Sequence, residues 1–198
     1  MTVRELGGNA PFIVFDDADG DAAVAGAMVA KMRHSAETCT AANRFFVQAG
    51  VADEFARKFA AAMAAIRVGN GFDEGVECGP LIHVGAVETV AGLVDDAVAA
   101  GAEVATGGGR VAGAGSFFEP TVLTNVAPDS PITRHEIFGP VAPLITFTEV
   151  DEMIVRANDT EMGLIAYVYT RDLARGLAVS ERLEAGKNGL TRGAESDP

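Results

Sequence analysis

The sequence predicts an open α/β domain of three layers (α/β/α), in which helices cover both faces of a mostly parallel sheet. Short apolar runs alternate along the chain with helical patterns of ten or more residues. Parallel strands require connections of that length, and right-handed crossovers place the connecting helices on the two faces. With 198 residues, 48% of them hydrophobic, the chain is able to bury a full core. We therefore expect one domain over residues 1–198, without an internal linker.

The first third of the chain is predicted to form two strands, each followed by a helix. Pro11 to Phe15 is a short apolar run, and the acidic stretch after it favours a helix that starts near Asp21. Residues 43–48 form the second apolar run. The second helix is predicted from four apolar residues at helical spacing, Phe55, Phe59, Met63 and Ile66.

The middle of the chain is predicted to hold one helix between two glycine-rich loops. Gly69 to Pro80 has no periodic pattern and indicates a loop. The helix extends from Val84 to Val98 and stops at Gly101, the residue type that most easily adopts a left-handed C-terminal cap. A strand follows at 102–106, and residues 107–120 are expected to be irregular or to form a hairpin.

The last third returns to alternating strands and helices. Its strands are predicted at 141–147, 164–170 and 188–191, and its helices at 150–158 and 172–183.

Charge and composition exclude several classes of partner. The formal net charge is −13, and no Lys/Arg-rich stripe is present to neutralise phosphates, so we expect no nucleic-acid binding. No apolar run approaches the roughly 20 residues of a membrane span, and the N-terminus lacks a targeting pattern, so neither a membrane location nor secretion is expected. Two cysteines do not form a disulfide framework, and a reducing cytoplasm fits them best.

Two motifs are better explained structurally than chemically. Gly107 to Ala112 matches the dinucleotide pattern G-x-G-x-x-A, but the glycines after it cannot start the helix that a phosphate site needs. We interpret it as a flexible turn. Cys78, beside Gly79 and Pro80, is interpreted as a small buried residue. The isolated histidines give no zinc-ligand spacing with either cysteine.

Cys39 is the strongest candidate for chemistry. It lies between a predicted helix and a predicted strand, where functional loops are common, and Arg33 lies six residues before it as a cation able to lower a thiol pKa or hold a substrate carboxylate. Glu5 supplies a carboxylate, and a thiol with a carboxylate is able to form and then hydrolyse a thioester. Two alternatives stay open: a buried inert thiol, and a thiol hydrolase that pairs Cys39 with His34.

Six motifs, in this order and spacing, resemble the aldehyde dehydrogenase superfamily. Residues 9–19 and Ala166-Tyr167 are similar to its succinate-semialdehyde dehydrogenase branch in particular. The six motifs are Glu5 to Pro11, Thr38 to Arg44, Gly79 to Ile82, Phe118 to Leu123, Glu136 to Pro140, and Ala157 to Leu164.

The resemblance implies a role for several residues. Cys39 would be the nucleophile and Glu5 the general base of a dehydrogenase that uses NAD or NADP. Leu6 would lie beside the nicotinamide. Glu136 would accept hydrogen bonds from the nicotinamide ribose, and Phe138 would pack near it.

The substrate implied by the resemblance is a small aldehyde, with succinate semialdehyde as the expected one. Arg33 and Ser196 match the positions that bind the distal carboxylate in the succinate-semialdehyde branch. The resemblance covers the catalytic domain only, about the second half of a family member. The cofactor-binding domain before it and the tail after it would be absent. The chain is then either an enzyme or a folded but catalytically incomplete fragment, and an exposed docking face would favour homo-oligomers or self-association.

The chain departs from the family pattern at two places. Ala36-Glu37 replaces the usual Gly-Gln before Thr-Cys, which adds a β-carbon and a negative charge near Cys39. Leu190-Thr191-Arg192 replaces a segment that commonly contains Asn, at the far wall of the expected pocket. Ala41 stands where some relatives carry a second cysteine.

Overall fold

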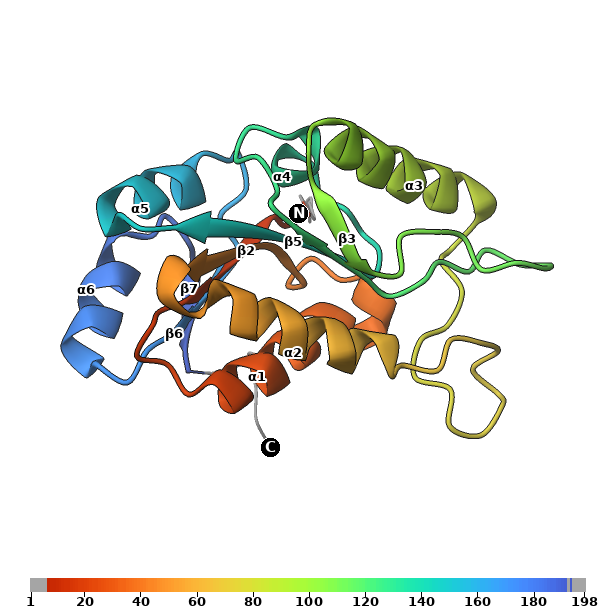
Figure 1. Ribbon diagram of the computed structural model, residues 1–198, viewed down its shortest axis with the longest axis horizontal. Helices are drawn as coiled ribbons and strands as arrows, with labels where there is room; N and C mark the ends of the chain where they lie inside the picture. Colours follow the sequence, from red (N-terminus) through yellow and green to blue (C-terminus); the bar gives the residue numbers. More distant parts are fainter. Residues whose placement is uncertain (1–6, 192, 194–198) are drawn as a thin grey trace, which may run out of the picture.

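The computed structural model describes residues 7–191 and 193, which form a sheet between two layers of helices (Figure 1). The seven strands of the described part have the order β3-β4-β5-β2-β1-β6-β7. All neighbours are parallel except β3 and β4. The strands are β1 (Ala10–Val14), β2 (Ala42–Gln48), β3 (Glu103–Thr106), β4 (Thr121–Thr124), β5 (Val141–Phe147), β6 (Ile165–Tyr169) and β7 (Lys187–Leu190).

Helices cover both faces of the sheet, as the alternating pattern predicts. On one face lie α1 (Gly20–Met32) and α2 (Ala52–Ala64). On the other lie α3 (Val84–Ala99), α4 (Pro131–Arg134), α5 (Val150–Asn158) and α6 (Leu173–Arg182). Two short 3-10 helices, η1 (Arg33–Ala36) and η2 (Ala49–Val51), follow α1 and β2. The α/β/α fold class is therefore confirmed.

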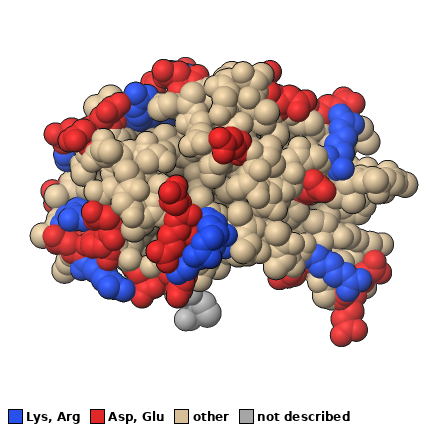
Figure 2. All heavy atoms as spheres, in the orientation of Figure 1, with Lys and Arg blue, Asp and Glu red and all other residues tan. Residues whose placement is uncertain are grey.

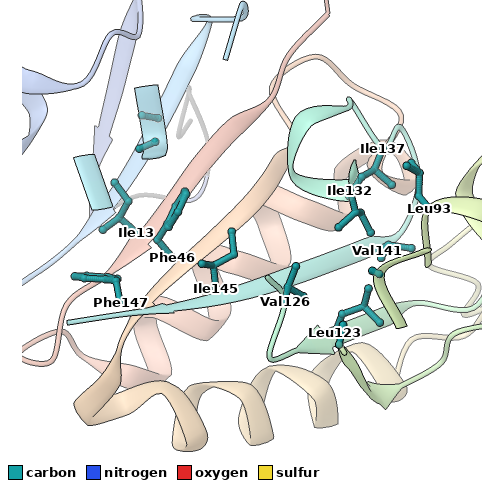
Figure 3. Packing of buried hydrophobic residues seen from close by; sticks show 14 of the residues in the cluster. Ile13, Phe46, Leu93, Leu123, Val126, Ile132, Ile137, Val141, Ile145 and Phe147 are labelled. Carbon is teal, nitrogen blue, oxygen red and sulfur yellow. The ribbon is translucent and has the colours of Figure 1, made fainter. Parts of the chain in front are cut away.

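The central strands are buried on both sides because each face of the sheet carries its own apolar core. Successive side chains of a strand point to opposite faces, so β1 sends Phe12 to the layer of α1 and α2 and Ile13 to the opposite layer. Figure 3 shows the core on the face covered by α3, α4, α5 and α6, where Ile13 and Phe46 lie beside Ile145. In the core on the face covered by α1 and α2, the ring of Phe12 stacks on that of Tyr169, with ring centroids 4.9 Å apart.

Most predicted elements are found within one or two residues of their predicted ends. Strand β5 and helix α5 have the predicted bounds, and α3 ends before Gly101, which has a left-handed φ of +104°. Residues 107–120 contain no helix and form an isolated antiparallel bridge between Arg110 and Phe118, so the expectation of an irregular or hairpin region is confirmed.

Two elements do not follow from the sequence pattern. Strand β4 has only four residues, too few to show a period, and it is recognised only by its pairing between β3 and β5. Helix α4 is a single turn with Pro131 at its start. Strand β3 lies at the sheet edge antiparallel to β4, since residues 107–120 connect the two strands without a crossover helix.

The surface carries the acidic excess in a dispersed form. On the face drawn in Figure 2, acidic side chains are spread widely, with basic side chains next to several of them. Lys58, for example, forms ion pairs with both Asp21 and Glu54. In the part of the chain that the structure describes, no helix has the length and apolar character needed to cross a membrane.

Candidate active site

Two predicted site residues, Cys39 and Glu136, lie before the amino ends of parallel strands. Gly7 and Gly8 lead into β1, Cys39 precedes β2, and Glu136 precedes β5. Since β1, β2 and β5 are parallel neighbours, the segments that enter them meet at one edge. Open α/β sheets usually bind ligands at the carboxyl ends of their strands, so this site uses the opposite edge.

Gly8 brings the segment before β1 against the turn that carries Cys39. The α-carbon of Gly8 lies so close to the main-chain carbonyl of Cys39 that a β-carbon at this position would overlap it. Only glycine permits this approach. Cys39 itself is half-buried, not sealed in the apolar core, which argues against the inert-thiol alternative. The carbonyl of its neighbour Thr40 accepts a hydrogen bond from Tyr167 Oη at 2.8 Å.

Glu136 joins the same contact from the other side. Its Oε1 accepts a hydrogen bond from the Gly8 main-chain N–H at 2.8 Å. Its Oε2 lies against the α-carbon of Gly7, which has a left-handed φ of +77°. The Glu136 carboxylate is therefore held beside the Cys39 turn, with Gly8 between them.

Phe138, two residues after Glu136, carries an exposed aromatic ring. Its side chain is 41% exposed, and its backbone has a left-handed φ of +50°, a conformation that is uncommon for an aromatic residue. A fixed carboxylate and an exposed ring two residues apart suit a ribose and the flat ring attached to it. The residues present therefore fit the nicotinamide end of NAD or NADP.

A buried pair of asparagines, which the sequence analysis did not single out, positions the Glu136 segment. Asn43 Nδ2 donates to Asn9 Oδ1 at 2.7 Å and to the His135 carbonyl at 2.8 Å, while Asn43 Oδ1 accepts from the Ile137 N–H at 3.2 Å. Asn9 Nδ2 donates to the Thr133 carbonyl at 3.0 Å. Both asparagines are almost fully buried. They fix the main chain on either side of Glu136.

The buried side chain of Arg44 binds the main chain just before β1. Its guanidinium donates to the Asn9 carbonyl through Nε and Nη2, and to the carbonyls of Arg156 and Ala157. Burial lowers the pKa of Arg44 to about 10, and the charge of Asp159 opposes this shift. A signal for these residues exists in the sequence: Asn9, Asn43 and Arg44 are polar residues within or beside strands that are otherwise apolar.

The turn before Cys39 has an unusual backbone. His34, Ser35 and Ala36 all have left-handed φ values, between +53° and +66°. The expected disturbance at Ala36 thus appears as a β-carbon in a conformation that favours glycine. The added carboxylate of Glu37 is bound elsewhere, because it accepts a hydrogen bond from the Ile82 N–H at 3.0 Å.

The loop after α2 forms a hydrogen bond with the turn before Cys39. Ser35 Oγ accepts a hydrogen bond from the Gly79 N–H at 3.0 Å. Cys78, next in the chain, is 1% exposed, so its interpretation as a small buried residue is confirmed. Burial raises the pKa of the Cys78 thiol, and the Ser35 side chain opposes that shift.

Arg33 lies at the end of α1 with an exposed side chain. Within residues 7–191 and 193 it forms no salt bridge, so a surface ion pair does not explain it there. Thr191, by contrast, follows the carboxyl end of β7 and bonds to β6 through its N–H and the Val168 carbonyl. Three predicted site residues, Glu5, Leu6 and Ser196, lie outside the described residues.

Comparison with known proteins gives the family. The model of the aldehyde dehydrogenase family matches residues 1–198. The chain is 54% identical over 196 residues to a succinate-semialdehyde dehydrogenase of Paenarthrobacter nicotinovorans, covering 99% of this chain and 44% of that protein. It is 52% identical over 190 residues to a 3-sulfolactaldehyde dehydrogenase of Pseudomonas putida, covering 96% of this chain and 39% of that protein.

Solved structures agree with the sequence matches. An NADP-dependent enzyme of E. coli superposes with a TM-score of 0.95 and 49% identity, over 98% of this chain and 40% of that one. The chain thus spans less than half the length of these relatives. With the family model matched over the whole sequence, the chain belongs to the aldehyde dehydrogenase family.

Proposed function

We propose that this chain carries the catalytic part of an NAD(P)-dependent dehydrogenase, which oxidises a small anionic aldehyde to the carboxylic acid through a thioester on Cys39. The observation that carries the proposal is the contact around Gly8. Gly8 packs on the Cys39 carbonyl and donates to Glu136, so the candidate nucleophile and a candidate cofactor residue share one small region.

In the proposed reaction the Cys39 thiol forms the thioester and the Glu5 carboxylate activates the water that hydrolyses it. The Cys39 thiolate attacks the aldehyde carbon, and main-chain N–H groups stabilise the oxyanion that forms. NAD(P), when bound, supplies the acceptor for the hydride that leaves this carbon. Glu5 then removes a proton from water, whose oxygen attacks the thioester. The carbon–sulfur bond breaks, which regenerates the Cys39 thiolate and releases the carboxylate product.

Glu136, Phe138 and Leu6 are proposed to contact the cofactor. Glu136 would accept hydrogen bonds from the nicotinamide ribose, because a carboxylate that accepts one hydrogen bond, here from the Gly8 N–H, has lone pairs left to accept others. Phe138 and Leu6 would supply apolar contacts to the nicotinamide. Whether NAD or NADP is used depends on residues that meet the ribose 2′ position, which we expect in the part of the relatives that this chain does not span.

The substrate is proposed to carry an anionic group, with succinate semialdehyde as the first candidate. The names of the two relatives above give substrates that combine an aldehyde with a carboxylate or a sulfonate. Arg33 and Ser196 are the proposed contacts to that group. A guanidinium is able to bind a carboxylate with two parallel hydrogen bonds, which would orient the aldehyde toward Cys39.

The chain alone is proposed to correspond to the catalytic domain, over residues 1–198, in a reducing cytoplasm. Two rivals follow from this: an inert lobe that lacks productive cofactor binding, and a thiol hydrolase that uses Cys39 and His34. Self-association through the face where a cofactor domain would dock is also proposed. Sedimentation of the purified chain tests it.

One assay separates the three functions. With succinate semialdehyde and excess NAD(P), the absorbance of the reduced nucleotide is expected to appear for the wild type and to vanish for Cys39→Ala. Butanal, an uncharged aldehyde of the same length, is expected to react more slowly if an anion site exists.

The other outcomes point to the rivals. A normally folded chain without any signal would support the inert lobe and contradict dehydrogenase turnover by this chain. Ester hydrolysis that disappears in His34→Ala, without nucleotide reduction, would support the thiol hydrolase.

A further inference from the structure

Tyr167 is a buried tyrosine whose hydroxyl bonds to the turn that carries Cys39. It lies in β6 and is 2% exposed. Its ring packs beside that of Phe12 in β1, with ring centroids 5.8 Å apart. The hydroxyl donates to the Thr40 carbonyl at 2.8 Å. Since β1 lies between β6 and β2, this bond reaches across β1 to the segment that enters β2.

The residues around Cys39 form a β-turn. The Ala41 N–H donates to the Thr38 carbonyl at 3.0 Å, so Cys39 and Thr40 are the two central residues. Common types of β-turn differ mainly in the orientation of the central peptide unit, and the same closing bond is compatible with more than one type. Contacts from outside the turn are therefore needed to select one orientation.

Two contacts from neighbouring strands make that selection. The Cys39 carbonyl, which belongs to the central peptide unit, lies against the α-carbon of Gly8. The Thr40 carbonyl belongs to the next unit and is held by Tyr167. Because a peptide unit is planar, holding its carbonyl also sets the direction of its N–H. The two contacts together set the backbone on the carboxyl side of Cys39, whose α-carbon carries the thiol.

Packing alone does not explain the hydroxyl of Tyr167. Phe12 and Phe45 belong to the same apolar core, and a phenylalanine at position 167 would fill the same space. Burying a hydroxyl is unfavourable unless it is hydrogen-bonded. The bond to Thr40 offsets this cost, and it does so at the turn where the main chain places the candidate nucleophile.

A simpler explanation is that the hydroxyl satisfies the Thr40 carbonyl for stability alone. Thr40 is half-buried, so its carbonyl gains from a partner wherever the thiol points. Under this explanation, loss of the hydroxyl lowers the free energy of unfolding and leaves the thiol of the folded protein unchanged. If the hydroxyl positions the turn, its loss changes the behaviour of the thiol in the folded protein.

We propose that Tyr167 is a positioning residue, whose hydroxyl holds the turn at residues 38–41 so that the Cys39 thiol keeps one orientation. The consequence for turnover rests on the proposed function: a thiol held in one orientation meets the aldehyde carbon more often in a productive geometry. The positioning itself does not depend on turnover.

The test is Tyr167→Phe in the whole chain, which removes the hydroxyl and keeps the ring. The Ala41 amide, followed by NMR hydrogen exchange, is expected to exchange about tenfold faster, because the carbonyl of its peptide unit is no longer held. Alkylation of Cys39 by iodoacetamide, followed by peptide mass spectrometry, is expected to be about threefold faster, since the loosened turn exposes the thiol. The midpoint of its pH profile is expected to stay, because no charge is removed.

Tyr169→Phe is the matched control. Tyr169 lies two residues further along β6, belongs to the same core and is 3% exposed, but its hydroxyl lies against the α-carbon of Gly26 in α1. Its loss is expected to leave Ala41 exchange and Cys39 alkylation unchanged. Cys78 is the internal reference for alkylation: it is 1% exposed and is expected to react slowly in all three proteins.

A second measurement needs no substitution at position 167. The chain contains two tyrosines, Tyr167 and Tyr169, so labelling with 3-fluorotyrosine gives two fluorine resonances, which Tyr169→Phe assigns. Alkylation of Cys39 is expected to shift the Tyr167 resonance more than the Tyr169 resonance, because the alkylated turn moves against the hydroxyl that it bonds to.

The effect on turnover is expected to separate kcat from KM. Tyr167→Phe is expected to lower kcat severalfold while the KM values for the aldehyde and NAD(P) are unchanged, because the substrates still bind and the thiol attacks less often. A variant that had only lost stability would keep both parameters at a temperature where it is folded.

Four outcomes would overturn the proposal. Ala41 exchange equal to that of the wild type in Tyr167→Phe would show that the hydroxyl does not hold the turn. Faster exchange with unchanged alkylation would support the explanation by stability alone. Equal effects of the two tyrosine substitutions, or faster alkylation of Cys78, would show a general loosening of the core. Equal fluorine shifts would show that the turn and the hydroxyl are not coupled.

Failure of the proposed function is distinguishable from failure of this inference. Absence of nucleotide reduction in the wild type would contradict the dehydrogenase. It would leave the exchange, alkylation and fluorine measurements on the folded chain to decide the role of Tyr167.

Discussion

At the scale of single residues, the candidate site depends on backbone conformations and close approaches that few side chains permit. Gly8 allows two segments to touch, and Ala36 holds a left-handed φ of +66° in the turn before Cys39. At position 8 the residue is glycine, as the close approach to the Cys39 carbonyl requires. At position 36 the residue is alanine, whose β-carbon in the left-handed conformation costs about 1–2 kcal/mol.

Replacing Ala36 by glycine is therefore expected to stabilise the protein. Relief of the left-handed strain exceeds the extra entropy that glycine has in the unfolded chain, for a net gain of about 0.5–1 kcal/mol. Urea denaturation of Ala36→Gly measures it. Ala41→Gly, two residues after Cys39 and without a left-handed φ, is expected to shift the midpoint the other way. A lower midpoint for Ala36→Gly would contradict the presence of strain at this turn.

At the scale of elements, the sheet edge is assembled by polar residues inside apolar strands. Asn43 lies in β2 but bonds to both sides of Glu136, through the His135 carbonyl and the Ile137 N–H. These bonds connect the segment before β5 to the start of β2, and Asn9 connects it to the start of β1. The element that carries Glu136 is thus placed by its neighbours and not by its own short helix, α4.

Asn43→Ala is expected to destabilise the protein by about 2–3 kcal/mol, because it leaves buried partners without their hydrogen bonds. The Ile137 amide is expected to lose protection from hydrogen exchange more than amides in α6 do. Asn188→Ala, which removes one exposed amide bond to the Ser180 carbonyl, serves as the matched control and is expected to change stability by less than about 0.5 kcal/mol. Equal effects of both variants would argue against a positioning role for Asn43.

The sequence predicts the longer helices and strands well, but it predicts the tertiary contacts between them less well. Periodicity reveals β5 and α5 because each is long enough to repeat its pattern. It does not reveal β4 or α4, which are too short. The Gly8 contact and the Asn9–Asn43 pair join residues far apart in the chain, and local patterns contain no such information. The roles of Glu5, Leu6 and Ser196 come from resemblance alone and stay predictions.

At the scale of the whole molecule, burial moves the pKa values of a few groups far from their ordinary values. Lys31 is the clearest case, with its pKa lowered to about 7 by burial from an ordinary value of 10.5. Tyr169 shifts the opposite way: burial raises its pKa to about 12. A buried group whose pKa lies near neutrality, as that of Lys31 does, makes stability depend on pH in that range.

The sign for Lys31 follows from proton counting. Between pH 7 and about 10, the unfolded chain holds a proton on this amine and the folded chain does not, so acidification within this range favours unfolding. The contribution of Lys31 to stability is therefore expected to rise with pH from 7 to 9, with a slope of at most about 1.4 kcal/mol per unit. Tyr169 keeps its proton in both states until about pH 10, so it adds no slope in this range.

Urea denaturation of the wild type and of Lys31→Met at pH 7, 8 and 9 measures this slope directly. The variant has no amine to titrate, so its unfolding free energy is expected to vary less with pH, and its advantage over the wild type is expected to be largest at pH 7. Parallel curves for the two proteins would mean that Lys31 keeps its proton in the folded state. The amine would then have a partner strong enough to offset its burial.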